Sequence, residues 1–90
     1  MTSTDAVVRD RYGLHPRAAM RIQQLAAGFR ASMTLRASPG APPVPASAMI
    51  GLVSLGVRSG ESVHLEAQGP DEVEAIAALR ALCESGICHP

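Results

Sequence analysis

The sequence contains no lysine and no tryptophan, and Tyr12 and Phe29 are its only aromatic residues. Proteins that bind nucleic acids use a basic surface and, for single strands, aromatic side chains on which bases stack. Here eight arginines are balanced by eight acidic residues, so the formal charge is zero at pH 7. We therefore expect no nucleic-acid partner. No run approaches the roughly 20 apolar residues that span a membrane, so we also expect no membrane insertion.

Cysteine is scarce as well, since the chain holds only Cys83 and Cys88. Cys83 falls within a helical pattern, so a disulfide between the two would strain or unwind the end of that helix. We predict two reduced thiols in a reducing compartment. Cys88 and His89 are adjacent candidate ligands, but two more at a useful spacing are missing, so no metal is predicted. Without the charge and apolar run of a signal peptide at the N-terminus, we expect a cytoplasmic protein.

The 90 residues predict one domain, residues 1–90. Hydrophobic periodicity and turn residues predict the order strand, helix, strand, strand, helix, strand, helix. An antiparallel sheet with the helices on one face is the economical arrangement, which makes the fold α+β. The expected strands are Asp5–Asp10, Ala31–Ala37, Val44–Pro45 and Ser62–Ala67. The expected helices are Pro16–Gly28, Ala48–Leu55 and a last helix that starts at Pro70 and ends before Gly86, which suits the left-handed residue after the last turn.

The first and last helices have apolar residues at helical spacing, which predicts the faces that they bury. In the last helix we place Pro70 at the first helical position, because proline lacks only an amide that this position leaves unpaired. We expect His64, on the polar side of its strand, to be solvent exposed. The predicted buried faces are Ala19, Ile22, Ala26 and Phe29 in the first helix, and Val73, Ile76, Leu79 and Cys83 in the last.

The stretch Gly13–Ala19 places a histidine at the start of a helix. Pro16 fits the first helical position, so His15 takes the capping position beside the free amides of the first turn. A helix N-terminus favours anions, and a neutral imidazole is a competent nucleophile. Arg17 adds a cation whose planar fork matches phosphate oxygens. These residue types predict a histidine that receives a phosphoryl group.

Gly13–Ala19 resembles the active-site motif of HPr, the histidine phosphocarrier of the bacterial sugar phosphotransferase system, and Met49–Gly56 resembles the second signature of that family. The resemblance implies an open-faced β-sandwich with a four-stranded antiparallel sheet and three helices. It also implies that His15 accepts a phosphoryl group on Nδ1 from phospho-enzyme I and passes it to enzyme IIA proteins. No cofactor is implied. The protein would be a carrier with a phosphohistidine intermediate rather than a stand-alone enzyme.

The chain departs from the family in the order of two residues. The family usually has alanine after the histidine and proline after the arginine, whereas this chain has Pro16 and Ala18. Pro16 has no amide to offer the phosphoryl group, so we expect Arg17 and Ala18 to stabilise it instead. The phosphohistidine should therefore be less stabilised, and transfer or hydrolysis faster.

A second departure concerns regulation. Many HPr proteins carry a kinase-regulated serine at the start of the second helix, but this place holds Ala48, with Ser47 one residue earlier. We expect serine regulation to be absent or altered, with Ser47 as the candidate residue. By resemblance, the partner-binding residues are Met20, Arg21, Gln24, Met49, Ile50 and Val53.

An alternative function uses the same fold. The altered motif also fits an HPr-like regulatory docking module, of the nitrogen-related branch or acting on a transcriptional or metabolic regulator, with no part in sugar transport. Such a module would bind its partner even with His15 replaced by alanine. In either case we expect a monomer.

Overall fold

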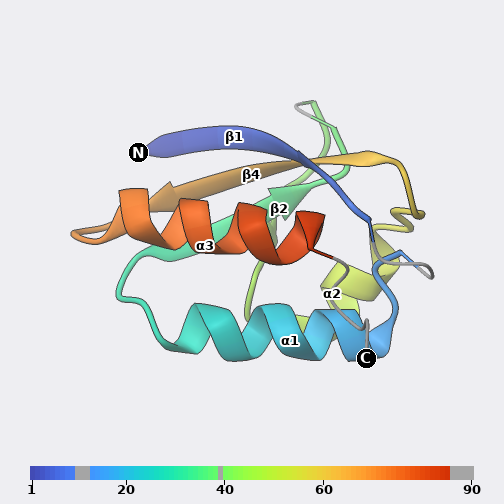
Figure 1. Cartoon of the computed structure of the whole chain (residues 1–90), viewed down its shortest axis with the longest axis horizontal. Helices are drawn as coiled ribbons and strands as arrows, with labels where there is room; N and C mark the ends of the chain where they lie inside the picture. The colour runs from blue at the N-terminus through green and yellow to red at the C-terminus, as the bar shows by residue number, and fades with distance from the viewer. Residues whose placement is uncertain (10–12, 39, 86–90) are drawn as a thin grey trace.

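The computed structural model describes residues 1–9, 13–38 and 40–85. It has the predicted order of elements (Figure 1). The strands are β1 (Thr2–Val7), β2 (Ser32–Arg36), β3 (Val44–Pro45) and β4 (Ser62–Gln68), and the helices are α1 (Pro16–Ala27), α2 (Met49–Ser54) and α3 (Glu72–Glu84).

The four strands form one sheet in the order β1-β4-β2-β3, and every pair is antiparallel. Leu65 in the centre of β4 lies opposite Thr4 of β1 and Leu35 of β2. The three helices cover one face of this sheet, and α1 and α3 run in opposite directions across it (Figure 1). This α+β open-faced sandwich confirms the predicted fold class.

The core lies between the sheet and the helices. Alternation in β4 points Val63, Leu65 and Ala67 inward, as the sequence predicted. The predicted stripe of the first helix is buried: Ala19 and Ile22 of α1 are buried, and Ala26 of α1 and Phe29, which follows the helix, are partly buried against the core. The largest fully buried side chains are Ile22, Leu35, Leu52, Leu65, Leu79, Val8, Val63 and Cys83.

Two predicted boundaries were wrong. β1 spans Thr2–Val7 rather than the expected Asp5–Asp10, because pairing with β4 extends it through Thr2, Ser3 and Thr4, which carry no apolar pattern. α3 starts at Glu72 with Asp71 as its N-cap, so Pro70 precedes the helix. The Asp71 carboxylate instead accepts hydrogen bonds from the amides of Arg30, at 2.9 Å, and Ala31, at 2.7 Å. This contact joins the start of α3 to the loop before β2.

Two predicted exposures were also wrong. Val73 was expected in the core, but it is 66% exposed, and Ala75 is buried in α3 together with Ile76, Leu79 and Cys83. The His64 side chain is only 17% exposed, because its Nδ1 lies 2.8 Å from the Asp5 carboxylate across the β1–β4 pair. Tyr12, Gly86, Cys88 and His89 lie outside the described residues.

Within the described part of the chain, no helix is both long and apolar enough to cross a membrane.

Candidate functional site

His15 is the N-cap of α1, with Pro16 in the first turn as predicted. Its backbone is extended, with φ −89° and ψ 174°, and its carbonyl accepts the amide of Ala19 at 2.9 Å. The ring nitrogen Nδ1 accepts a hydrogen bond from the Arg17 amide at 3.2 Å. Because an amide can only donate, this contact selects the neutral ring form whose lone pair is on Nδ1. In this geometry the lone pair of His15 is on Nδ1, at the N-terminus of α1.

The loop before His15 is fixed by backbone contacts with the turn after α2. The Leu14 amide donates to the Val57 carbonyl at 3.0 Å, and the Leu14 side chain is buried. Gly13 has φ +71°, and a Cβ there would collide with the Val57 carbonyl oxygen and lie 2.9 Å from the Arg58 Cα. Only glycine fits this close approach in a left-handed conformation. The role of Val57 was not predicted, because a backbone carbonyl leaves no side-chain signal in the sequence; Gly13 was the only hint.

The charges around His15 favour an anion. The first turn of α1 contains no acidic residue, and the whole helix carries Arg17 and Arg21 without a single carboxylate. Both arginines are exposed. The Ala18 side chain is fully buried, so this residue can serve an anion only through its backbone amide. A helix N-terminus with the Arg17 guanidinium in its first turn is suited to hold phosphate.

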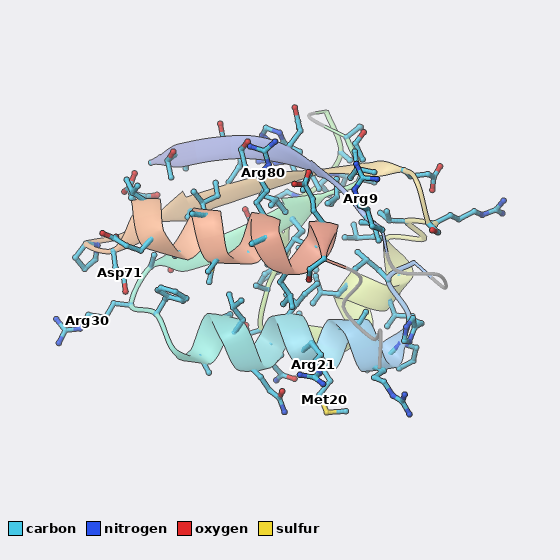
Figure 2. All side chains as sticks on the ribbon, viewed as in Figure 1. Arg9, Met20, Arg21, Arg30, Asp71 and Arg80 are labelled. Carbon is cyan, nitrogen blue, oxygen red and sulfur yellow. The ribbon has the colours of Figure 1, made fainter. Side chains whose placement is uncertain are left out.

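An exposed apolar surface lies on α1 and α2, which contact one another. Met20 is 44% exposed and projects from α1 away from the sheet, while Ile50 on α2 is 84% exposed (Figure 2). Val53 is partly buried, and the polar Gln24 is exposed. We call Met20, Arg21, Gln24, Ile50 and Val53 the α1–α2 surface. The Met49 side chain is outside what the structure describes.

The start of α2 has the features expected from its sequence. Ala48 is the N-cap and makes no side-chain capping hydrogen bond, whereas Ser47, one residue earlier, is exposed. A serine hydroxyl is therefore available beside α2 but is not at its capping position.

The other histidine and cysteine side chains among the described residues, His64 and Cys83, are not part of a site at His15. Among the described residues, no group of three or more histidine, cysteine and acidic side chains is placed to hold a metal ion. Cys83 is a free, buried thiol, and its burial raises its pKa to about 12. His64 contacts Asp5 on the face of the sheet opposite the helices and is not brought to His15.

The fold and site together define a small α+β protein that presents a histidine at a helix N-terminus. A family model described as the PTS HPr component phosphorylation site matches residues 2–85. The chain belongs to this HPr family of phosphocarrier proteins.

Relatives and solved structures of the family agree with this assignment. The chain is 38% identical to phosphocarrier protein NPr of Escherichia coli K12 over 79 residues, covering 88% of this chain and 87% of that protein. It is 36% identical to phosphocarrier protein HPr of Mycoplasma genitalium over 84 residues, covering 93% and 94%. The crystal structure of HPr-C-His from Thermoanaerobacter tengcongensis has a TM-score of 0.87 at 34% identity, covering 100% of this chain and 99% of that one.

Proposed function

We propose that this chain is a phosphoryl carrier that accepts a phosphoryl group from phospho-enzyme I on His15 and passes it to enzyme IIA proteins. The observation that carries the proposal is the 3.2 Å hydrogen bond from the Arg17 amide to His15 Nδ1 at the N-terminus of α1. It provides an unprotonated nucleophile at a place that favours an anion. We place this relay in the cytoplasm, in keeping with the predicted reduced thiols.

The transfer exchanges one phosphorus–nitrogen bond for another. The Nδ1 lone pair of His15 attacks the phosphorus of the donor's phosphohistidine, and the breaking bond returns its electron pair to the donor imidazole. Nδ1 then has no lone pair for the Arg17 amide. That amide is freed for a phosphoryl oxygen, together with the next first-turn amide, that of Ala18. The Arg17 guanidinium supplies the remaining positive charge.

The α1–α2 surface is proposed to dock enzyme I and enzyme IIA in turn, with Met49 as a further contact. It combines exposed apolar side chains, Met20 and Ile50, with the exposed cations Arg17, two residues after His15, and Arg21, about one helical turn further along α1. Methionine adapts its shape to several partners, which suits a carrier that must be released after each transfer.

The regulatory docking module is kept as the second candidate because of the NPr proteins among the relatives. The NPr of Proteus mirabilis is also 38% identical over 79 residues. In this candidate, the α1–α2 surface binds a regulated protein and sugar transport is not involved. We further propose that serine regulation is absent or altered, since Ala48 occupies the N-cap of α2. Stoichiometric phosphate on Ser47 after incubation with an HPr serine kinase would overturn that proposal.

The carrier function is tested by incubation with phosphoenolpyruvate and a bacterial enzyme I, followed by intact-mass measurement. We expect an acid-labile gain of one phosphoryl group, which is lost in His15→Ala and retained in the matched control His64→Ala. Absence of any gain with several active enzyme I preparations would reject the carrier.

Addition of purified enzyme IIA proteins then separates the two candidates. Phosphoryl transfer to a sugar-specific enzyme IIA supports the transport relay. A partner that binds His15→Ala as tightly as the wild type, with no transfer to any sugar-specific enzyme IIA, supports the docking module.

A further inference from the structure

Arg58 is an exposed cation beside the active-site loop, and it has no part in the relay described so far. It lies between α2 and β4. Its Cα is 2.9 Å from the place that a Cβ on Gly13 would take, and the Leu14 amide donates to the neighbouring Val57 carbonyl at 3.0 Å. The backbone of Arg58 therefore packs against the two residues that precede His15.

Hydrogen bonds fix the backbone around Arg58. The Glu61 carboxylate accepts the Arg58 amide at 2.7 Å, and the Glu61 amide donates to the Arg58 carbonyl at 3.0 Å. The same turn is tied to Val8, which follows β1. The Gly60 amide donates to the Val8 carbonyl at 2.7 Å, and the Val8 amide donates to the Glu61 carbonyl at 2.9 Å. Because the backbone is already ordered, a contact made by Arg58 costs little backbone entropy on binding.

The guanidinium group of Arg58 has no acidic partner among the described residues. Arg36 differs, since its Nε lies 3.0 Å from the Glu66 carboxylate. Glu61 is close to Arg58 in sequence, but its carboxylate is bound by the Arg58 amide. The Arg58 charge is therefore stabilised by water, and a protein that covered it would remove that water.

We propose that Arg58 binds a carboxylate of enzyme I while that protein presents its phosphohistidine to His15. This contact rests on the proposed carrier function and adds a recognition element to it. In-line attack by Nδ1 brings the donor phosphorus within a few ångströms of His15, so the donor covers the surface around the histidine loop. Covering a guanidinium without a counter-charge is unfavourable, whereas a carboxylate offers its planar fork two hydrogen bonds.

The phosphoryl group is the other anion at this site, but its ligands lie on α1. The first-turn amides and Arg17 follow His15 in that helix. Arg58 belongs to a separate segment, which contacts Gly13 before the histidine. We therefore assign Arg58 to the donor protein rather than to the phosphoryl group. As a consequence, Arg58 disfavours any partner that places an apolar or basic group at this position.

The first test is phosphorylation kinetics, with this chain as the varied substrate of the bacterial enzyme I that phosphorylates the wild type most efficiently. Arg58→Ala should raise KM by roughly fivefold and Arg58→Glu by roughly twentyfold, with kcat changed by less than about twofold. Arg58→Lys keeps the charge and should hold KM within about threefold of the wild type. Arg30→Ala is the matched control and should leave KM unchanged, because Arg30 is also exposed but lies at the other end of α1 (Figure 2).

The second test identifies the group that Arg58 contacts. The chain has no lysine, so Arg58→Lys introduces a single side-chain amine. A carbodiimide joins an amine to a carboxylate that touches it. It should link this amine to an aspartate or glutamate of enzyme I, which peptide mass spectrometry then locates. Arg30→Lys is the control and should give no link to enzyme I.

The outcomes separate this contact from the carrier function. A wild type that no enzyme I phosphorylates would overturn both. If the wild type is phosphorylated, but Arg58→Ala and Arg58→Glu have the KM of Arg30→Ala, the carrier function stands and the Arg58 contact is wrong. A lower kcat or a shorter phosphohistidine lifetime at unchanged KM would assign Arg58 to the phosphoryl group instead, and absence of the cross-link would also overturn the proposal. Circular dichroism confirms folding of each variant.

Discussion

The exchanged order of proline and alanine after the histidine is the residue-scale feature with the largest chemical consequence. In this chain the first-turn amides nearest His15 come from Arg17 and Ala18, because Pro16 has none. In the usual order of the family the proline follows the arginine, so the missing amide lies two residues later than in this chain. The number of donors is therefore conserved, but their position relative to the histidine is shifted.

Pro16→Ala adds one amide next to the phosphoryl group, so we expect a longer-lived phosphohistidine. A hydrogen bond to a charged group contributes about 1.5–3 kcal/mol, which corresponds to a lifetime increase of roughly ten- to a hundredfold. The loss of acid-labile phosphate is followed by intact mass after enzyme I is removed. Ala18→Pro is the opposite change and should shorten the lifetime. An unchanged lifetime in Pro16→Ala would contradict the role assigned to the missing amide.

Gly13→Ala should both destabilise the fold and impair phosphorylation, because Gly13 closes on the Val57 carbonyl with φ +71°. The left-handed conformation costs about 1–2 kcal/mol and loss of the Leu14–Val57 hydrogen bond about 1 kcal/mol, so we expect about 3 kcal/mol in total. Gly56→Ala is the control, since Gly56 has φ +68° with nothing within 4 Å of an added Cβ. It should cost only about 1 kcal/mol. Equal losses in urea denaturation would show that contact with Val57 does not matter.

At the scale of elements, the start of α3 is held by the Asp71 carboxylate. Hydrogen bonds from the amides of Arg30 and Ala31 lower the pKa of Asp71 below its ordinary value of 3.8. A lowered folded-state pKa gives stability that is present above about pH 4 and is lost as the pH falls through the folded-state pKa. Asp71 and Arg30 lie together where the α1–β2 loop meets α3 (Figure 2).

We therefore expect Asp71→Asn to be less stable than the wild type at pH 7, with the difference shrinking steadily below pH 4. Thermal unfolding from pH 2 to pH 7 measures it. Glu74→Gln removes a carboxylate from the exposed face of α3 and should leave the pH profile unchanged. A constant difference between wild type and Asp71→Asn at all pH values would mean that the carboxylate charge is not involved.

The same region shows how far the sequence carried the prediction. Apolar patterns and turn residues together were sufficient for the type and order of the elements, because each stretch between two turns had to be a strand or a helix. The sequence pattern wrongly placed Pro70 inside the last helix and Val73 in the core. The start of α3 is decided by Asp71, whose hydrogen-bond partners are about 40 residues away in the sequence. Likewise, His64 is covered by Asp5 from a strand at the other end of the chain. The candidate site was predictable where side chains define it, at His15 and Arg17, but not where the Val57 backbone supports it.

For the whole molecule, the contact between β1 and α3 joins the two ends of the described chain. The Arg9 amide donates to the Cys83 carbonyl at 3.1 Å, and the Val7 amide donates to the Glu84 carboxylate at 3.3 Å. The Cys83 side chain is fully buried behind this contact. Arg9 and Arg80 lie along its outer edge (Figure 2). A reagent reaches the Cys83 sulfur only when β1 and α3 separate.

Cys83 should therefore report the opening of the whole fold. Its pKa is raised to about 12, so at pH 8 it is a protonated, inaccessible thiol in the native state. We expect labelling with iodoacetamide, mapped to Cys83 by peptide mass spectrometry, to be at least a thousandfold slower than in the urea-unfolded chain, as for a core group that opens with the global free energy. If β1 alone peels away, the labelling rate will rise only weakly with urea. If the core opens as a unit, the logarithm of the labelling rate will rise with urea concentration with the slope of global unfolding. Cys83 belongs to α3 and lies at its contact with the β1 segment, so we expect the core to open as a unit. A native-state labelling rate within tenfold of the rate in the unfolded chain would refute the proposal that this contact covers the Cys83 sulfur.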